Sequence, residues 1–310
     1  MRLAPGTSVA VRSPASSANL GPGFDSVGLA LGLWDECRVS VTEGPGLVIE
    51  VEGEAADEVP RDARHLVYRS MLTTFGHLDI TPPSGLHLVC RNGVPHGRGL
   101  GSSATAIVTG IYAAQLLAAR SEGGAGAPDL AVTNRLASAL EGHPDNASAS
   151  VFGGATLSVM NPADGELPLT ETVALPLHES ISVVVCVPDG QLSTEKARSV
   201  LPGAVPLATA AASTARGALL IHALTSDPSL LMSGTVDVLH QEPRRPAYPD
   251  SMALVDRLRA AGLAATISGA GPSVLILTAH DEEADRVAAQ TPSHWRTVTP
   301  GVPQHGVHEV

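Results

Sequence analysis

The 310-residue sequence contains a single lysine, Lys196. A Walker phosphate-binding loop requires a Gly-Lys-Ser or Gly-Lys-Thr step, so the chain has no loop of that kind. Aromatic residues are also scarce, at 3%, and we therefore expect a core built from Ala, Val and Leu. The three cysteines, Cys37, Cys90 and Cys186, are widely spaced and form no C-x-x-C motif. This pattern predicts buried thiols in a reducing compartment, with the cytoplasm as the default location.

Long apolar runs and basic surfaces are not expected either. No apolar run approaches the length that spans a bilayer, and the first residues lack the apolar core of a signal peptide. The formal net charge of −12 argues against a nucleic-acid-binding surface, where a basic face is expected. We therefore predict neither a membrane partner nor a nucleic-acid partner. The length is comfortable for two domains, and a hydrophobic content of 44% is that of a globular protein.

Glycine is plentiful, and the stretch from Val94 to Ala106 is the most informative part of the chain. Its glycines are Gly97, Gly99 and Gly101. Glycine tolerates a positive φ and leaves room for a ligand against the backbone. A helix is predicted from about 104 to 120, with Ser102 or Ser103 as its cap. Free N–H groups at such a helix start form an anion site, for which phosphate is the usual occupant. The alternative is a segment that binds no ligand, with an ordinary turn followed by an ordinary helix cap.

Two other segments combine small residues with polar side chains. In the first, Pro14 to Asp25, prolines and glycines predict a loop in which Asn19 and Asp25 carry the polar chemistry. The alternative there is a pair of Asx-turns that stabilise the loop. In the second, a helix predicted over 130–140 ends in Glu-Gly-His-Pro-Asp-Asn, which leaves three polar residues projecting from its C-terminal end. These are Glu141, Asp145 and Asn146. A plain helix terminator is the alternative, and His143 is interpreted as a turn residue.

The second half of the chain is expected to begin after a turn cluster at residues 161–165. A strand is predicted over 181–187, a buried alanine-rich helix over 206–224 and another helix over 228–239. Two strands, 264–267 and 274–278, are joined by the glycine-rich segment Ser268 to Ser273. The turn cluster is the expected boundary between two domains, residues 1–162 and 163–310, and the alternation of strands and helices is compatible with the α+β architecture that the family resemblance below implies.

The three glycine-rich segments together resemble the GHMP kinases. The match comprises Pro95 to Ala104, Pro14 to Asp25 and Ser268 to Ser273, in the expected order. The resemblance implies a ribosomal-protein-S5-like N-terminal domain that binds ATP and a ferredoxin-like C-terminal domain that contributes to the substrate site. The Pro14 to Asp25 string is closest to the members that use ATP and Mg²⁺ to phosphorylate the side-chain hydroxyl of L-homoserine in threonine biosynthesis.

The same resemblance implies roles for particular residues. The nucleotide would be held by Pro95, His96, Gly97, Arg98, Gly99, Leu100, Gly101, Ser102, Ser103, Ala104 and Thr105. Magnesium would be held by Ser103 and Glu141. The amino acid would be held by Asn19, Asp25, Asn146, Thr194, Arg198 and Arg245. Arg198 and Arg245 suit its carboxylate, and Asp25 suits its ammonium. Asp145 is the obvious base by type, although a loose transition state for phosphoryl transfer makes little demand for a base.

Some positions depart from the family pattern. His65 stands where the family often has an Asn near the base, and Arg135 stands where some members have the magnesium carboxylate. Arg245 matches the Glu-Pro-x-Arg pattern, and Arg244 is the neighbour that could be mistaken for it. A different small-molecule kinase of the family and a binding protein without turnover remain as alternatives. A homodimer is possible.

Overall fold

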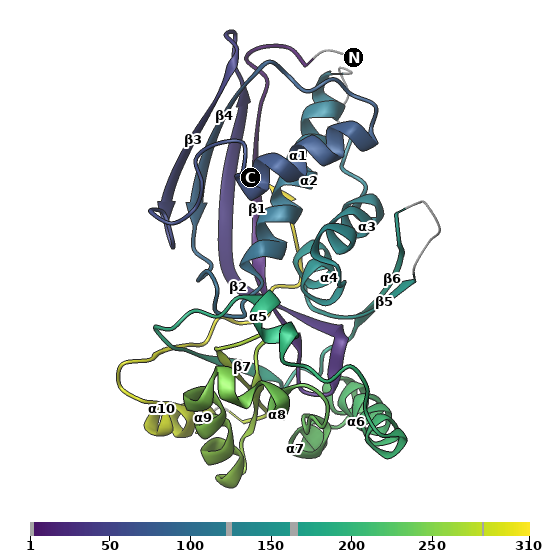
Figure 1. Ribbon diagram of the computed structural model, residues 1–310, viewed down its shortest axis with the longest axis vertical. Helices are drawn as coiled ribbons and strands as arrows, with labels where there is room; N and C mark the ends of the chain where they lie inside the picture. Colours follow the sequence, from purple (N-terminus) through teal and green to yellow (C-terminus); the bar gives the residue numbers. More distant parts are fainter. Residues whose placement is uncertain (1–2, 122–125, 162–166, 281) are drawn as a thin grey trace.

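The computed structural model describes residues 3–121, 126–161, 167–280 and 282–310. Two sheets carry the architecture, one of seven strands and one of four. In Figure 1 the larger sheet and the helices that cover it occupy the upper part of the molecule, and the smaller sheet and its helices occupy the lower part. The predicted α+β fold with two parts is confirmed.

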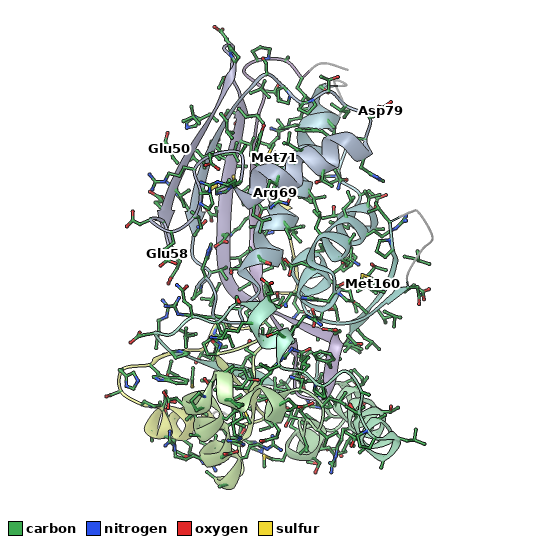
Figure 2. The ribbon with its side chains drawn as sticks, viewed as in Figure 1. Glu50, Glu58, Arg69, Met71, Asp79 and Met160 are labelled. Atoms are coloured by element: carbon green, nitrogen blue, oxygen red, sulfur yellow. The ribbon has the colours of Figure 1, made fainter. Side chains whose placement is uncertain are left out.

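The larger sheet runs β11-β1-β2-β4-β3, and a branch of β5 and β6 pairs through β2. Its strands are β1 (Ser8–Asn19), β2 (Gly23–Val41), β3 (Gly46–Gly53), β4 (Gly85–Asn92), β5 (Ala155–Asn161), β6 (Leu169–Leu175) and β11 (His308–Glu309). Its helices are α1 (Leu66–His77), α2 (Ser102–Ser121), α3 (Leu130–Glu141) and α4 (Asp145–Phe152). Met71 on α1 is fully buried, whereas Glu50 on β3 is exposed (Figure 2).

The smaller sheet has the antiparallel order β10-β7-β9-β8. Its strands are β7 (Ser182–Val187), β8 (Ala264–Ile267), β9 (Val274–Thr278) and β10 (Arg296–Val298). The helices of this half are α5 (Thr194–Ser199), α6 (Leu207–Thr225), α7 (Leu231–Gly234), α8 (Gln241–Arg244), α9 (Pro249–Ala260) and α10 (Glu282–Gln290). The core between this sheet and α9 is built mainly from Val, Leu, Ile and Ala, but it also contains Tyr248 and Trp295, which the expectation of an Ala, Val and Leu core did not include.

The segment from Pro14 to Asp25 is mostly strand, and the prediction of a loop there is wrong. Residues 14–19 end β1 and residues 23–25 begin β2, so the turn covers only three residues. From there β2 continues without a break to Val41. Small side chains explain why residues 14–19 can be strand, because Ser16 and Ser17 are fully buried in the sheet and make hydrogen bonds to other segments. The next strand along the chain, β3, pairs in parallel with β4.

The expected domain boundary between residues 162 and 163 lies outside the described residues. β6, which follows residue 163, still pairs within the larger sheet. β11, near the end of the chain, also pairs there, with β1. All three cysteines are buried, as predicted, and none forms a disulfide.

Two helices are long and apolar enough to cross a bilayer by length and composition, contrary to the sequence expectation. In the apolar window of α2, 72% of residues are buried, as in the core helix of a globular protein. In α6 the share is 22%, so the prediction that this helix is buried is wrong. Length and composition alone are weak evidence for a membrane span.

Candidate active site

A cleft of about 240 Å³ lies between the two halves of the molecule, and both contribute to its walls. It brings together most of the residues that the sequence singled out. Those on its walls are Asn19, Asp25, Gly97, Gly99, Gly101, Ser102, Ser103, Glu141, Asp145, Asn146, Thr194 and Arg198. The predicted residues that do not line it are Pro95, His96, Arg98, Leu100, Ala104, Thr105 and Arg245. The first six of these lie between residues 95 and 105, next to the glycines and serines that do line the cleft.

The glycine loop, residues 97–101, lines the cleft, and its carbonyl groups accept hydrogen bonds from other segments of the chain. Its glycines Gly97, Gly99 and Gly101 have φ values of 65°, 72° and 70°. The carbonyls of residues 97–100 accept hydrogen bonds from Leu192, Ser273, Ser268 and Ser16. The N–H groups of residues 99–103 donate to no group in the described part of the chain. Because α2 begins at Ser102, the free N–H groups of the loop and the helix start have the arrangement that an anion site requires.

Close packing, as well as the positive φ, requires glycine in this loop. A Cβ atom on Gly99 would lie 2.2 Å from the carbonyl oxygen of Ser268, and one on Gly101 would lie 2.3 Å from Oγ of Ser16. The contact at Gly99 is with backbone of the second half. The two glycine-rich segments are therefore pressed against each other across the cleft.

Glu141 ends α3, and Gly142 caps the helix in the left-handed conformation. Ser103 at the start of α2 donates a hydrogen bond to this carboxylate. Burial raises the pKa of Glu141 above its ordinary value, more than the Ser103 hydrogen bond and the His143 charge lower it. Arg135 does not line the cleft and donates to a backbone carbonyl at residue 167 instead. A buried carboxylate and a hydroxyl beside a phosphate site fit a hard cation such as Mg²⁺, which prefers oxygen ligands.

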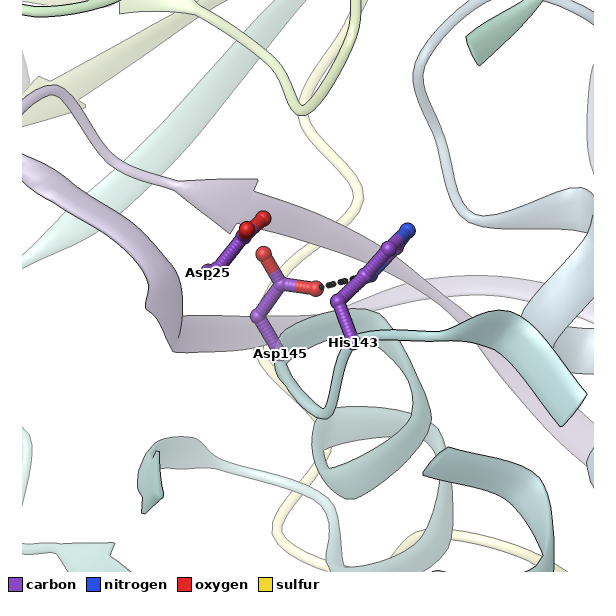
Figure 3. Close-up of side chains that lie close together, drawn as sticks. All are labelled: Asp25, His143 and Asp145. Atoms are coloured by element: carbon purple, nitrogen blue, oxygen red, sulfur yellow. Dashed lines mark hydrogen bonds and ion pairs between the residues drawn. The ribbon is translucent and has the colours of Figure 1, made fainter. Parts of the chain in front are cut away.

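Three side chains, Asp25, His143 and Asp145, meet in the cleft beside the glycine loop, as Figure 3 shows. Nδ1 of His143 and Oδ1 of Asp145 are 2.8 Å apart. Burial lowers the pKa of His143, but the hydrogen bond and charge of Asp145 outweigh it, so the pKa is raised overall. One oxygen or nitrogen atom from each of the three residues lies within 4.8 Å of the others, a spacing that could also hold a metal ion. His143 therefore lines the cleft, whereas the sequence analysis interpreted it only as a turn residue.

Asp145 and Asn146 begin α4, a helix that the sequence analysis did not expect. They therefore project from a helix start and not from the end of the preceding helix. Oδ1 of Asp145 accepts the N–H of Asn146 at 2.7 Å, and Oδ1 of Asn146 accepts the hydroxyl of Ser16 at 3.0 Å. Both side chains are thereby held toward the cleft.

Asn19 and Asp25 flank the turn between β1 and β2, and both have a positive φ, 71° and 54°. Nδ2 of Asn19 donates to the carbonyl of Gly269 at 3.0 Å, and its Oδ1 accepts the N–H of Asp25 at 3.0 Å. This turn is thus tied to the glycine-rich segment of the second half. Non-glycine residues with a positive φ concentrate at functional sites, where the surroundings hold them in place.

Arg198 on α5 reaches across the cleft and forms a two-pronged ion pair with Asp25, at 2.5 and 3.1 Å. Asp25 comes from the first half and Arg198 from the second, so the pair joins the two parts of the molecule. Both side chains are about one-third exposed, which leaves them open to a ligand. Thr194 begins the same helix and also lines the cleft.

Arg245 lies outside the cleft, and its neighbour Arg244 lines it. The guanidinium of Arg245 pairs with Glu242 and Asp256 at the surface, at 2.6 and 2.8 Å. Arg244 is 2% exposed, and its Nε donates to the carbonyl of Ala197 at 2.8 Å. The Glu-Pro-x-Arg pattern therefore predicted Arg245, the arginine of this pair that does not line the cleft.

Buried partners hold Arg244 in position. Nη1 of Arg244 lies 3.1 Å from Nδ1 of His240, and Nε2 of His240 lies 2.8 Å from the carbonyl oxygen of Gly21. Phe24 stacks on the His240 ring, with centroids 5.0 Å apart, and lies 5.5 Å from the Arg244 guanidinium. Sequence reasoning missed Arg244, His240 and Phe24, although an Arg four residues after a His in one short segment is a visible signal.

Comparisons with known proteins agree with this geometry. Sequence models of the GHMP kinase N-terminal and C-terminal domains match residues 65–154 and 219–297. A homoserine kinase of Streptomyces avermitilis is 50% identical over 93% of this chain and 90% of its own length. A homoserine kinase of Rhodococcus opacus is 49% identical, with 89% of each chain covered.

Solved structures are also similar. The crystal structure of a homoserine kinase from Cytophaga hutchinsonii has a TM-score of 0.83 and 25% identity, over 98% of this chain and 97% of that one. A mevalonate diphosphate decarboxylase from Staphylococcus aureus, at 17% identity and a TM-score of 0.67, shares the fold. With two matched domains and full-length relatives at half identity, the chain belongs to the GHMP kinase family.

Proposed function

We propose that this kinase transfers the γ-phosphoryl group of ATP to the side-chain hydroxyl of L-homoserine and releases O-phospho-L-homoserine, a step of threonine biosynthesis. The observation that carries the proposal is the cleft itself, in which a phosphate-binding loop faces two buried or half-buried arginines and a carboxylate. The names of the full-length relatives support the same acceptor. A cytoplasmic location fits a biosynthetic enzyme with three free cysteines.

The phosphates would be held by the backbone N–H groups of the glycine loop and of the start of α2. Preorganised donors of this kind stabilise the charge that spreads over the transferred group. Magnesium would be held by Ser103 and Glu141, and it would neutralise phosphate charge. The cluster in Figure 3 is a poorer magnesium site, because one of its three ligand atoms is an imidazole nitrogen.

The amino acid would occupy the part of the cleft between Asp25 and the two arginines. Its carboxylate suits Arg198 and Arg244, because a guanidinium binds a carboxylate with two parallel hydrogen bonds. Arg244 replaces Arg245 in this assignment, since only Arg244 lines the cleft. The ammonium group suits Asp25. Asn19, Asn146 and Thr194 would fix the remaining groups and direct the hydroxyl toward the phosphates.

Asp145 is the proposed acceptor of the hydroxyl proton. It lines the cleft beside Asp25, and His143 holds its orientation. The raised pKa of His143 favours an imidazolium, whose Nδ1–H would donate to Asp145 and hold that carboxylate in place. Positioning of the two substrates supplies most of the rate enhancement in a reaction of this type.

The test is ADP release by the purified protein, measured with ATP, Mg²⁺ and each candidate acceptor in turn. Turnover with L-homoserine, abolished by a chelator, supports the proposal. Turnover only with mevalonate or a sugar would assign the chain to another branch of the family. Tight binding of ATP and homoserine without turnover would indicate a binding protein and contradict the proposal.

A further inference from the structure

Tyr248 is a buried residue whose hydroxyl has no partner in the described part of the chain. It lies in the connection between α8 and α9, is 3% exposed and belongs to the apolar core beneath the smaller sheet. Its hydroxyl oxygen is buried and makes no hydrogen bond to the described residues. A buried polar atom without a partner lowers stability, and most such atoms have one, so this exception calls for an explanation.

The ring of Tyr248 lies directly behind one wall of the cleft. A Cβ atom on Gly271 would lie 3.0 Å from Cδ1 and Cε1 of this ring. Gly271 belongs to the glycine-rich segment of the second half, whose Gly269 and Ala270 line the cleft. Tyr248 itself does not line the cleft. Its hydroxyl can therefore act on a ligand in the cleft only through a neighbouring side chain.

That neighbour is Arg244, which lines the cleft four residues earlier in the chain. Burial raises the pKa of Tyr248, and the charge of Arg244 opposes this rise, which shows that the phenol and the guanidinium lie close together. Arg244 is a buried cation whose hydrogen bonds, at Nε and Nη1, go to a carbonyl and an imidazole. Its Nη2 makes no hydrogen bond within the described part of the chain. An unpartnered hydroxyl thus lies beside an unpartnered guanidinium nitrogen.

The packing and the backbone of Tyr248 do not require its hydroxyl. Its N–H donates to the carbonyl of Arg245 at 3.2 Å, and its carbonyl accepts the N–H of Met252 at 3.1 Å. The contact with Gly271 is made by ring carbons. A phenylalanine would keep all of these interactions and would leave no buried polar atom without a partner. Stability alone therefore does not account for a tyrosine at this position.

The five N–H groups of a guanidinium can all be counted in Arg244. Nε uses its single N–H on the carbonyl of Ala197, and Nη1 lies 3.1 Å from Nδ1 of His240. A carboxylate that binds with two parallel hydrogen bonds to the end of the guanidinium takes one N–H from Nη1 and one from Nη2. One N–H of Nη2 then remains. The neutral phenol oxygen of Tyr248 is an acceptor suited to it.

We propose that Tyr248 is a positioning residue for Arg244, whose guanidinium donates a hydrogen bond to the Tyr248 hydroxyl when the carboxylate of the amino acid is bound. This inference rests on the proposed function, because the amino-acid substrate supplies the carboxylate. Ala197, His240 and Tyr248 then take one N–H group each, and the carboxylate takes two. The hydroxyl therefore contributes to the affinity for the amino acid and not to the affinity for the nucleotide.

The test is Tyr248→Phe, which removes only the hydroxyl. The KM for homoserine should rise about 10-fold, the lower end of the range for a hydrogen bond to a charged group, while kcat and the KM for ATP stay nearly constant. In an Arg244→Ala background the same substitution should leave the KM for homoserine nearly unchanged, because the hydroxyl acts through the guanidinium. The melting temperature of Tyr248→Phe, measured without substrates, should equal or exceed that of wild type, because an unpartnered buried hydroxyl is removed.

Tyr112→Phe is the matched control, because Tyr112 is also buried, at 9% exposed, but belongs to α2 in the first half of the molecule. It should leave both KM values unchanged. An unchanged KM for homoserine in Tyr248→Phe would overturn the inference, and so would an equal rise with and without Arg244. A Tyr248→Phe protein that fails to fold, or that loses stability while kcat and both KM values change in parallel, would show a structural role instead. No turnover of wild-type enzyme with ATP and homoserine would count against the proposed function.

Discussion

The two sides of the cleft are built in different ways. On the proposed nucleotide side, consecutive backbone groups of the glycine loop and α2 carry free N–H groups, and the chain from residue 97 to residue 103 supplies nearly all of them. On the amino-acid side, single side chains from β2, α4, α5 and α8 converge from positions as far apart as Asp25 and Arg244. The first side depends on local conformation, and the second depends on packing between distant segments.

The strongest test of the proposed nucleotide side is Gly99→Ala. The new Cβ would collide with backbone carbonyl and amide groups of residues 268 and 271, which cannot swing aside like a side chain. We expect kcat/KM to fall by at least about 100-fold, because a displacement of about 1 Å at a catalytic site has an effect of that size. The measurement is steady-state kinetics with both substrates.

Gly262→Ala is the control for Gly99→Ala. Gly262 also has a positive φ, 79°, but a Cβ there would meet nothing within 4 Å. It should lower the melting temperature slightly and leave kcat/KM unchanged. Equal losses of activity in the two variants would show that positive φ, and not close approach, explains the glycine at position 99.

The amino-acid side is tested by comparing Arg244→Ala with Arg245→Ala. Loss of Arg244 removes a charge-assisted contact of about 1.5–3 kcal/mol, so the KM for homoserine should rise by about 10- to 100-fold. Arg245→Ala should change it less than twofold, because that guanidinium pairs at the surface. The KM for ATP should be nearly constant in both. A larger effect from Arg245→Ala would reverse the assignment.

The smallest expected effect comes from His240, which positions Arg244 without lining the cleft. His240→Ala should raise the KM for homoserine by about 5-fold, the value of one hydrogen bond of about 1 kcal/mol. His240→Asn keeps an acceptor near the position of Nδ1 and should recover part of the loss. If both variants alter kcat and the two KM values in parallel, His240 serves stability and not the orientation of Arg244.

The nucleotide side could be predicted from sequence because its information is local. Three glycines at alternate positions, followed by two serines and a run of good helix formers, define a loop and a helix start without reference to the rest of the chain. Asn19 and Asp25 were found for a similar reason, since they are the polar residues of one short string. Their strand conformation was missed because small buried residues have weak strand preferences of their own.

The choice between Arg244 and Arg245 could not be made locally. Asp237 accepts the N–H groups of residues 239–241, and so sets where α8 begins and which arginine turns inward. The predicted helix over 228–239 ends early, at Gly234. Residues 235–240 instead form the non-helical connection between α7 and α8.

The contact between Asp25 and Arg198 carries a consequence for selectivity. These opposite charges satisfy each other, so any molecule that enters between them must separate the pair. A zwitterion can replace both partners at once, with its carboxylate on the arginine and its ammonium on the aspartate. A ligand that bears only one of those charges leaves the other half of the bridge without a counter-ion. Under the roles proposed for Asp25 and Arg198, the bridge would therefore select against amines, carboxylic acids and neutral alcohols of the same size.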